Sequence, residues 1–249
     1  MNACASPRRS FRLFTVEMSC MDGALLEHVA ASVKAAHNFS GILLYGSWAS
    51  EQSAPHSDVD LICISPHHQN YHLLMTCDEV AIDIYTSTRS LLEESIRKDS
   101  RTNNNFVLDA FTHGRILDEG HGSIEALCKL ASEIWRAGPL PPSPAERQAT
   151  SMVVQKALTS CRRLAKKSKL SDEWKSIADL KLGYLFQELV YAYCRVHRLW
   201  GSSLWEMLTW KSPQYQELLV LCRRYLGTNC VEARMRAIEN LVYLILCKT

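Results

Sequence analysis

The chain has 249 residues, of which 47% are hydrophobic and 22% are charged, a balance typical of a soluble globular protein with a real core. Its longest apolar run, around Ile42 to Tyr45, is far too short to span a bilayer, which excludes a membrane-spanning segment. The length suits two modest domains or one large one.

The ten cysteines are scattered and form no C-x-x-C pair, and most lie in apolar patterns where a free thiol acts as a small hydrophobic residue. No ligand cluster has the spacing of a zinc site. Three arginines near the start are followed by no apolar stretch of the length that a secretory signal needs. We therefore expect a cytoplasmic protein without a membrane partner. Residues 1–21 are expected to form a flexible arm, or to lie upstream of a start at Met18 or Met21.

The formal net charge of +2 hides an asymmetry between the two halves of the chain. Residues 1–144 have 11 Lys and Arg against 17 Asp and Glu, whereas residues 145–249 have 17 against 9. A basic second half would suit contact with a polyanion such as RNA. Solvated helix faces that happen to be basic would give the same count.

In chain order, apolar residues at helical spacing begin at Asp22, and a short apolar strand over 41–45 follows. Residues 48–57 are polar and contain Pro55, which predicts a loop. Ser90 and Glu93 match a capping box for the next helix. The other predicted elements of this half are strands over 58–64 and 79–85 and helices over 90–96, 106–111 and 123–135.

Four prolines within residues 138–144 interrupt the pattern and predict a domain boundary. Beyond it the apolar period is helical throughout, with helices expected near 145–168, 172–200, 203–210, 213–226 and 230–247. The prediction is an α+β chain with a flexible arm over 1–21, a mixed sheet flanked by helices over 22–137, a Pro-rich linker over 138–144 and an all-α helical bundle over 145–249.

Three acidic residues are the candidate metal ligands. Asp58 and Asp60 are two positions apart in a predicted strand, so they share one face, and their mutual repulsion would be relieved by a bound divalent cation. Asp83 interrupts an apolar strand in which a lone charge is costly to bury. If the two strands are neighbours with these residues on one face, the carboxylates can hold Mg²⁺, which prefers oxygen ligands. Solvated or salt-bridged structural acids are the alternative.

Gly46 and Ser47 end the preceding strand and are candidates for phosphate binding. Because glycine has no Cβ, the backbone at Gly46 can approach a phosphate closely, and the Ser47 hydroxyl can add a donor. Gly46 could also be a simple turn glycine.

Together, the stretch Leu43-Leu-Tyr-Gly-Ser47, the later Ser57-Asp-Val-Asp-Leu61 and the strand with Asp83 resemble the signature of the polymerase-beta-like nucleotidyltransferase superfamily. The resemblance covers roughly residues 22–120. It implies a nucleotidyltransferase domain with a mixed sheet, two Mg²⁺ ions and an NTP donor, most often ATP. Gly46 and Ser47 would hold the triphosphate, Asp58 and Asp60 would hold metal, and Asp83 would hold metal or accept the acceptor's proton.

The helical second half is similar in layout to small bacterial nucleotidyltransferases, including aminoglycoside adenylyltransferases. Phe111-Thr-His-Gly-Arg-Ile-Leu-Asp118 also resembles the end of their catalytic domain. The resemblance implies transfer of a nucleoside monophosphate to an acceptor hydroxyl, with a small molecule such as an aminoglycoside favoured as acceptor. The alternatives are RNA, for instance a tRNA end, and a non-catalytic NTP-binding module. This chain departs from the pattern at Trp48, where many relatives have a basic residue.

Several other residues have both a functional and a structural interpretation. Glu146 could be the general base, or an ordinary residue at a helix N-terminus. Lys156 could contact phosphate, although a solvated helix face is the simpler interpretation, and His56 and His113 are assigned no catalytic role. The aromatic residues of the second half are expected to form the bundle core: Trp200, Trp205, Trp210, Tyr184, Tyr191 and Tyr193.

Overall fold

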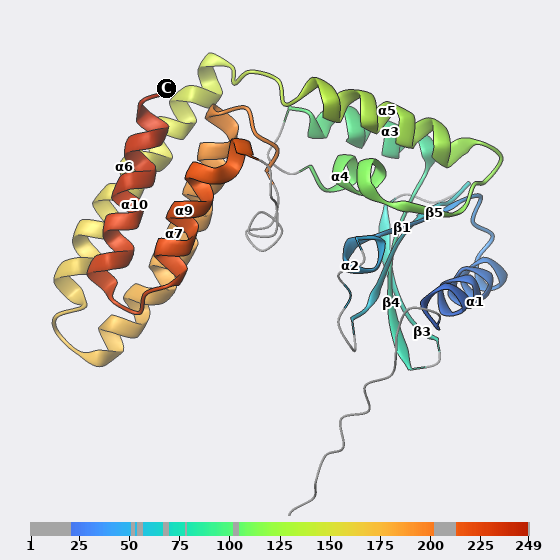
Figure 1. Ribbon diagram of the computed structural model, residues 1–249, viewed down its shortest axis with the longest axis horizontal. Helices are drawn as coiled ribbons and strands as arrows, with labels where there is room; N and C mark the ends of the chain where they lie inside the picture. Colours follow the sequence, from blue (N-terminus) through green and yellow to red (C-terminus); the bar gives the residue numbers. More distant parts are fainter. Residues whose placement is uncertain are drawn as a thin grey trace, which may run out of the picture. The chain divides into compact units, whose positions relative to one another are not determined.

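The computed structural model describes residues 21–50, 53, 57–66, 70–77, 79–101, 105–201 and 213–248 (Figure 1). The chain divides into two compact units, Met1–Asn38 and Phe39–Thr249. Residues 1–20 of the predicted arm, the predicted helix over 203–210, His56, Trp205 and Trp210 lie outside the described residues.

In the first unit, helix α1 (Met21–Ala36) confirms the helix predicted from Asp22. Leu26, Val29 and Val33 are buried on one side of it, at the spacing of a helical face.

The second unit begins with a five-stranded mixed sheet in the order β3-β4-β2-β1-β5. Only the central pair, β2 and β4, is parallel, and the other pairs are antiparallel. The strands are β1 (Ile42–Tyr45), β2 (Val59–Ile64), β3 (Tyr71–Cys77), β4 (Val80–Ser87) and β5 (Arg115–Asp118).

The three predicted strands are confirmed as β1, β2 and β4, but the two edge strands β3 and β5 were not predicted. In β3, half-buried residues alternate with exposed ones, and the strand has a consecutive apolar run of only three residues, Leu73 to Met75. Strand β5 has only four residues and directly follows a helix. Edge strands depend on their neighbours for pairing, and a local pattern detects them poorly.

The loop predicted over 48–57 is partly wrong, because α2 (Gly46–Ala49) forms one helical turn at the end of β1. The Trp48 indole N–H donates to the Ser57 carbonyl oxygen over 3.3 Å. This bond joins the two ends of the loop between β1 and β2, and therefore ties the Gly46–Ser47 turn to the start of the acidic strand.

Helices α3 (Arg89–Asp99), α4 (Phe106–His113) and α5 (Ser123–Ala137) pack together beside the sheet (Figure 1). They bury a core with the sheet residues Leu43, Ile62 and Ile64. The predicted cap was displaced by two residues, since Thr88, not Ser90, accepts the backbone N–H of Leu91.

The remaining regular elements described in the second unit are all helical: α6 (Pro144–Lys167), α7 (Asp172–Val196), the short 3₁₀ turn η1 (Pro213–Tyr215), α9 (Gln216–Leu226) and α10 (Val231–Leu246). These helices share a buried core that includes Tyr193. Tyr184 was wrongly expected in this core, because it is 66% exposed. The α+β class, with a mixed sheet followed by helices, is confirmed.

The Pro-rich segment lies between α5 and α6, where a break was predicted, and side chains after and within α7 bind its backbone. Arg195 donates to the Leu140 carbonyl oxygen, and Arg198 donates to that of Pro139 over 3.2 Å. Trp200 donates its indole N–H to the Trp135 carbonyl oxygen over 3.0 Å and stacks on the Trp135 ring. Trp200 therefore packs with the α3–α5 core and not with the bundle core. The division of this chain into domains at 138–144 stays a prediction.

The described helices include none that combines the length and the apolar character needed to cross a bilayer.

One buried acid fixes the start of α4. The Asp99 carboxylate accepts the backbone N–H groups of Val107 and Leu108 over 3.0 and 3.1 Å, which satisfies two donors at the helix N-terminus. Burial raises the pKa of Asp99 to about 6, although these two bonds favour its ionised form.

Asp99→Ala is expected to lower the free energy of unfolding by about 2 kcal/mol, because two buried N–H groups lose their acceptor. Urea denaturation followed by circular dichroism measures the change. Glu94→Ala, an exposed position on the same helix, is the control and should change it little. Equal stability of the two variants would show that Asp99 does not cap α4.

Candidate active site

Asp60 and Asp83 lie directly opposite each other on the parallel strands β2 and β4, so their side chains leave the same face of the sheet. This is the arrangement that the sequence analysis expected. Asp58 lies one residue before β2, so the alternation of side chains along a strand, on which its prediction was based, does not fix its direction. Its charge nevertheless contributes to the raised pKa of Asp60. Asp58, Asp60 and Asp83 are called the acid trio below.

The environment of Asp60 disfavours its charge. Burial, the charge of Asp58 and the charge of Asp83 together raise the pKa of Asp60 to about 6. No cationic side chain pairs with Asp60 in the described part of the chain, and a carboxylate held beside two like charges is costly. Such groups are concentrated at functional sites. A divalent cation would remove this cost.

Gly46 lies against the Asp60 carboxylate. A Cβ built on Gly46 would be 2.2 Å from Asp60 Oδ2, and the residue has φ of +70°, which side chains rarely adopt. Both constraints require glycine here. The hydroxyl of Ser50, the residue after α2, donates to the Gly46 carbonyl oxygen, whereas the Ser47 hydroxyl has no partner among the described residues. The turn therefore has a hydroxyl that is unpaired in the described part of the chain, one residue after the glycine that lies against Asp60.

Tyr45 and His72 also belong to this site, and the sequence analysis assigned a role to neither. Tyr45 is opposite Asp60 in the β1–β2 register, and burial and the charges of Asp60, Asp83 and Asp58 raise the pKa of its hydroxyl. His72 Nδ1 lies 3.3 Å from Asp83 Oδ1. Tyr45 immediately precedes the Gly-Ser pair and could have been noticed there, but His72 lies on the strand that was missed.

Whether Mg²⁺ fits these residues depends on how many protein ligands it needs. No group of three or more His, Cys, Asp or Glu side chains that could hold one metal ion is present among the residues described. Mg²⁺ generally binds proteins through one or two carboxylates and takes its remaining ligands from water and substrate phosphates. The opposed pair Asp60 and Asp83 meets that requirement. A role for all three acids as ligands stays a prediction.

Glu146 has structural partners that argue against a role as general base. Its carboxylate accepts the Ser143 backbone N–H in a capping box and pairs with Arg195 over 2.7 Å. The hydrogen bond from Arg195, with those from Ser143, lowers the pKa of Glu146 to about 2. A carboxyl with this pKa is a poor proton acceptor near neutral pH.

The remaining candidates lie in structural settings. Lys156 is exposed on α6. His113 Nδ1 lies 3.0 Å from Asp109, one turn earlier in α4, and its ring contacts Trp135 edge to face.

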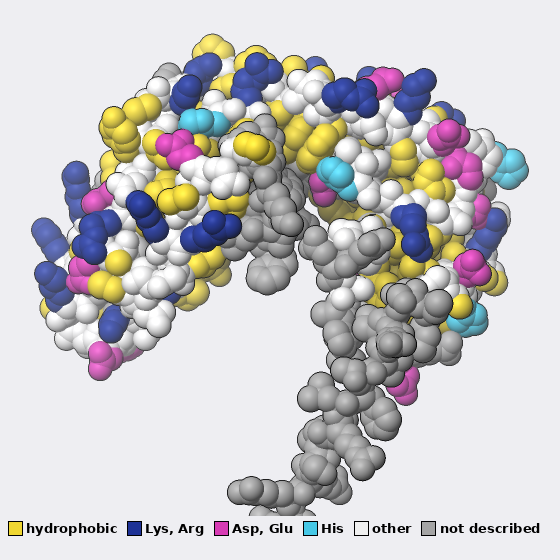
Figure 2. All heavy atoms as spheres, viewed as in Figure 1, with side chains coloured by type: hydrophobic (Ala, Val, Ile, Leu, Met, Phe, Trp, Pro, Cys, Tyr) yellow, Lys and Arg dark blue, Asp and Glu magenta, His cyan; other side chains and the backbone are white. Residues whose placement is uncertain are grey.

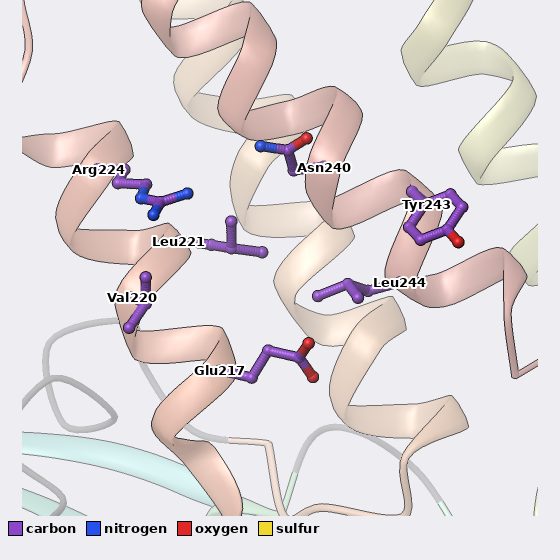
Figure 3. A pocket seen from close by; sticks show the side chains of 7 residues that line it. All are labelled: Glu217, Val220, Leu221, Arg224, Asn240, Tyr243 and Leu244. Carbon is purple, nitrogen blue, oxygen red and sulfur yellow. The ribbon is translucent and has the colours of Figure 1, made fainter.

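A groove of about 360 Å³ lies between α9 and α10, with the side chains of Glu217 and Leu221 directed into it (Figure 3). Among its described lining residues, Glu217 is the only acid, and its carboxylate accepts the Tyr193 hydroxyl, so the groove does not resemble a phosphoryl-transfer site.

No protein-family model matches the sequence, and no curated protein matches it. Among solved structures, the chain is similar to one described as a nucleotidyltransferase-like protein from Exiguobacterium sibiricum 255-15, with 16% identity and a TM-score of 0.41. The match covers 92% of this chain and 75% of that one. The geometry of the acid trio, and not this similarity, is the basis of the functional proposal.

Asp60→Asn is expected to stabilise the metal-free protein. Because the folded-state pKa of Asp60 is raised from its ordinary 3.8 to about 6, its ionisation opposes folding above that value. At about pH 7.5 the variant should gain on the order of 1 kcal/mol in free energy of unfolding, after allowance for solvent screening. The gain should disappear as the pH falls through about 6 toward about 4, where the wild-type carboxyl is also neutral.

Urea denaturation at a series of pH values with EDTA present measures this difference. Glu133→Gln, at an exposed position on α5, should show no such pH dependence. A destabilised Asp60→Asn variant at neutral pH would contradict the proposed crowding of like charges.

Proposed function

We propose that this protein is a Mg²⁺-dependent nucleotidyltransferase that moves a nucleoside monophosphate from an NTP to an acceptor hydroxyl. The proposed group is AMP. The observation that supports it best is the direct opposition of Asp60 and Asp83 on neighbouring strands, with the Gly46–Ser47 turn against the Asp60 carboxylate. Two oxygen ligands beside a phosphate-binding turn are what phosphoryl transfer requires of a protein.

In the proposed reaction, the backbone at Gly46 and the Ser47 hydroxyl position the triphosphate. The acceptor oxygen attacks the α-phosphorus, the bond from that phosphorus to the bridging oxygen breaks, and pyrophosphate leaves. Asp83 accepts the proton of the acceptor hydroxyl. When bound to the acid trio, two Mg²⁺ ions would supply the charge neutralisation that the phosphate oxygens need.

For the acceptor, we propose a small hydroxylated molecule, for instance a cationic one such as an aminoglycoside. The first half of the chain, which contains the acid trio, has an excess of acidic residues, 17 against 11 Lys and Arg. A cationic acceptor would be attracted to it.

The second candidate acceptor is RNA, and one observation favours it. Lys and Arg side chains are conspicuous on the surface of the helical bundle (Figure 2). Near the end of α6, Arg162, Arg163 and Lys166 are exposed, and none of them forms an ion pair with Asp or Glu in the described part of the chain. Unpaired cations of this kind suit a phosphate backbone.

Salt dependence separates the two acceptors. If RNA is bound, the affinity for a short RNA hairpin should fall steeply between about 50 and 200 mM NaCl, by ten-fold or more for several phosphate contacts. Fluorescence anisotropy with a labelled hairpin measures this. The combined change of Arg162, Arg163 and Lys166 to Gln should flatten the slope, whereas the same change at Arg101, Lys129 and Arg136, which are exposed in the first half, should not. No binding at low salt would favour the small molecule.

Activity tests the acid trio directly. With ATP, Mg²⁺ and a panel of acceptors, pyrophosphate release is expected in wild type and should fall on the order of 100-fold or more in Asp60→Asn and Asp83→Asn. Glu146→Gln should keep turnover within about two-fold, because the wild-type carboxylate is paired with Arg195 and we propose Asp83 as the base. Thermal unfolding in the same buffer verifies that each variant is folded.

A loss of activity in Glu146→Gln without loss of folding would restore that residue as the general base. The transferase assignment would be wrong if wild type released no pyrophosphate, like the Asp60 variant, and also showed no Mg²⁺-dependent binding of ATP. ATP binding without turnover for any acceptor would favour a non-catalytic NTP-binding module.

A further inference from the structure

Four ring side chains from separate elements form a continuous row beside the acid trio. Phe106, the first residue of α4, contacts Tyr45 on β1 and Tyr85 on β4 edge to face. The Phe106 ring centroid is 5.2 Å from that of Tyr45 and 5.8 Å from that of Tyr85. His72 on β3 continues the row, 5.2 Å from Tyr85. These distances lie within the range of favourable aromatic contacts. The four residues are called the aromatic row below.

The row borders the acids on the same face of the sheet. Tyr45 is opposite Asp60, and Tyr85 is two residues after Asp83 on β4, so strand alternation directs both rings to the side of the carboxylates. His72 contacts Asp83 directly. The row is therefore placed to contact the non-phosphate part of a nucleotide whose phosphates are bound at the acid trio.

Core packing does not bury the row completely. Within the row, Phe106 is 37% exposed and the His72 side chain is 61% exposed. Beside the row, Leu74 is opposite Asp83 in the register and is 79% exposed. Further along the same sheet face, Leu43 and Ile62 are completely buried in the α3–α5 core. Apolar surface left accessible beside convergent polar groups is typical of ligand sites.

We propose that the aromatic row, with Phe106 at its centre, binds the nucleobase of the donor nucleotide. This inference rests on the proposed function. The Gly46–Ser47 turn directly follows Tyr45, so the row begins where the triphosphate would be held. In an NTP, the base is one ribose away from the α-phosphate, and it is the planar, poorly hydrated part of the molecule. A sugar-like or polyamine acceptor has no such ring to stack.

The chemistry of the row also predicts which bases it accepts. Phe106 has no hydrogen-bonding group, and stacking tolerates every base because each has a π-face. Purines offer a larger stacking surface than pyrimidines. The site should therefore bind ATP and GTP similarly, and both more tightly than CTP and UTP.

The test separates the base from the phosphates. Isothermal titration calorimetry in excess Mg²⁺ compares ATP with inorganic tripolyphosphate, which has no base or ribose. Phe106→Ala is expected to weaken ATP binding roughly ten-fold, the loss of about one stacking contact, and to leave tripolyphosphate binding within about two-fold. Phe106→Leu keeps apolar volume at the start of α4 and should also weaken ATP selectively. Leu170→Ala, an equally apolar position that is 72% exposed outside the site, should change neither ligand.

The outcomes distinguish this inference from the function on which it rests. If wild type binds both ligands but Phe106→Ala weakens them equally, or weakens neither, the aromatic row does not bind the base and the inference is overturned, while the phosphate site stands. If wild type binds neither ligand with Mg²⁺ present, the proposed function fails and the inference fails with it. A selective loss of ATP affinity in a variant with unchanged unfolding temperature supports it.

Discussion

The candidate site is built around one unfavourable pairing, the direct opposition of two aspartates on adjacent parallel strands. Like charges opposite each other in a sheet destabilise it, and the central β2–β4 pair includes Asp60 opposite Asp83. Two isoleucines, Ile82 and Ile84, flank Asp83 and are completely buried on the other face, so the strand is held in register against this repulsion. A fold that retains such a cost at its centre has the character of a functional site, where stability is lost in exchange for ligand binding.

The surrounding elements position the site through a short chain of contacts. The α3 residue Asp99 caps α4, and α4 begins with Phe106, whose ring contacts Tyr45 and Tyr85. At the other side, the Trp48 indole holds the loop that follows the Gly46–Ser47 turn. The proposed phosphate and base subsites are thus supported by one buried and one partly buried hydrogen-bonded side chain in the second unit, which agrees with the need to preorganise a site on rigid elements.

In the helical half, Glu146 fits two roles in the sequence, and its contacts in the structure favour the structural one. Glu146 lies three residues after Ser143, and this spacing is a capping-box pattern that the sequence already contained. Its second partner, Arg195, is 49 residues away and buried, and no local pattern indicates that contact. The ion pair leaves the carboxylate satisfied and strongly acidic. The helices of the second half therefore provide packing and a basic surface, and the proposed chemistry lies at the sheet.

The sequence by itself determined the features that depend on local spacing. Apolar periods placed the long helices and the central strands, and the Gly46–Ser47 pair, Asp58, Asp60 and Asp83 stood out because acids and glycine are unusual at those points of apolar strands. Only the tertiary structure decided which residues surround them. His72, Tyr85 and Phe106 come from three elements, one of them an edge strand without a clear pattern of its own, and their rings meet only because β3 pairs with β4 and α4 packs on the sheet. Such contacts join residues far apart in the chain, and no periodicity records them.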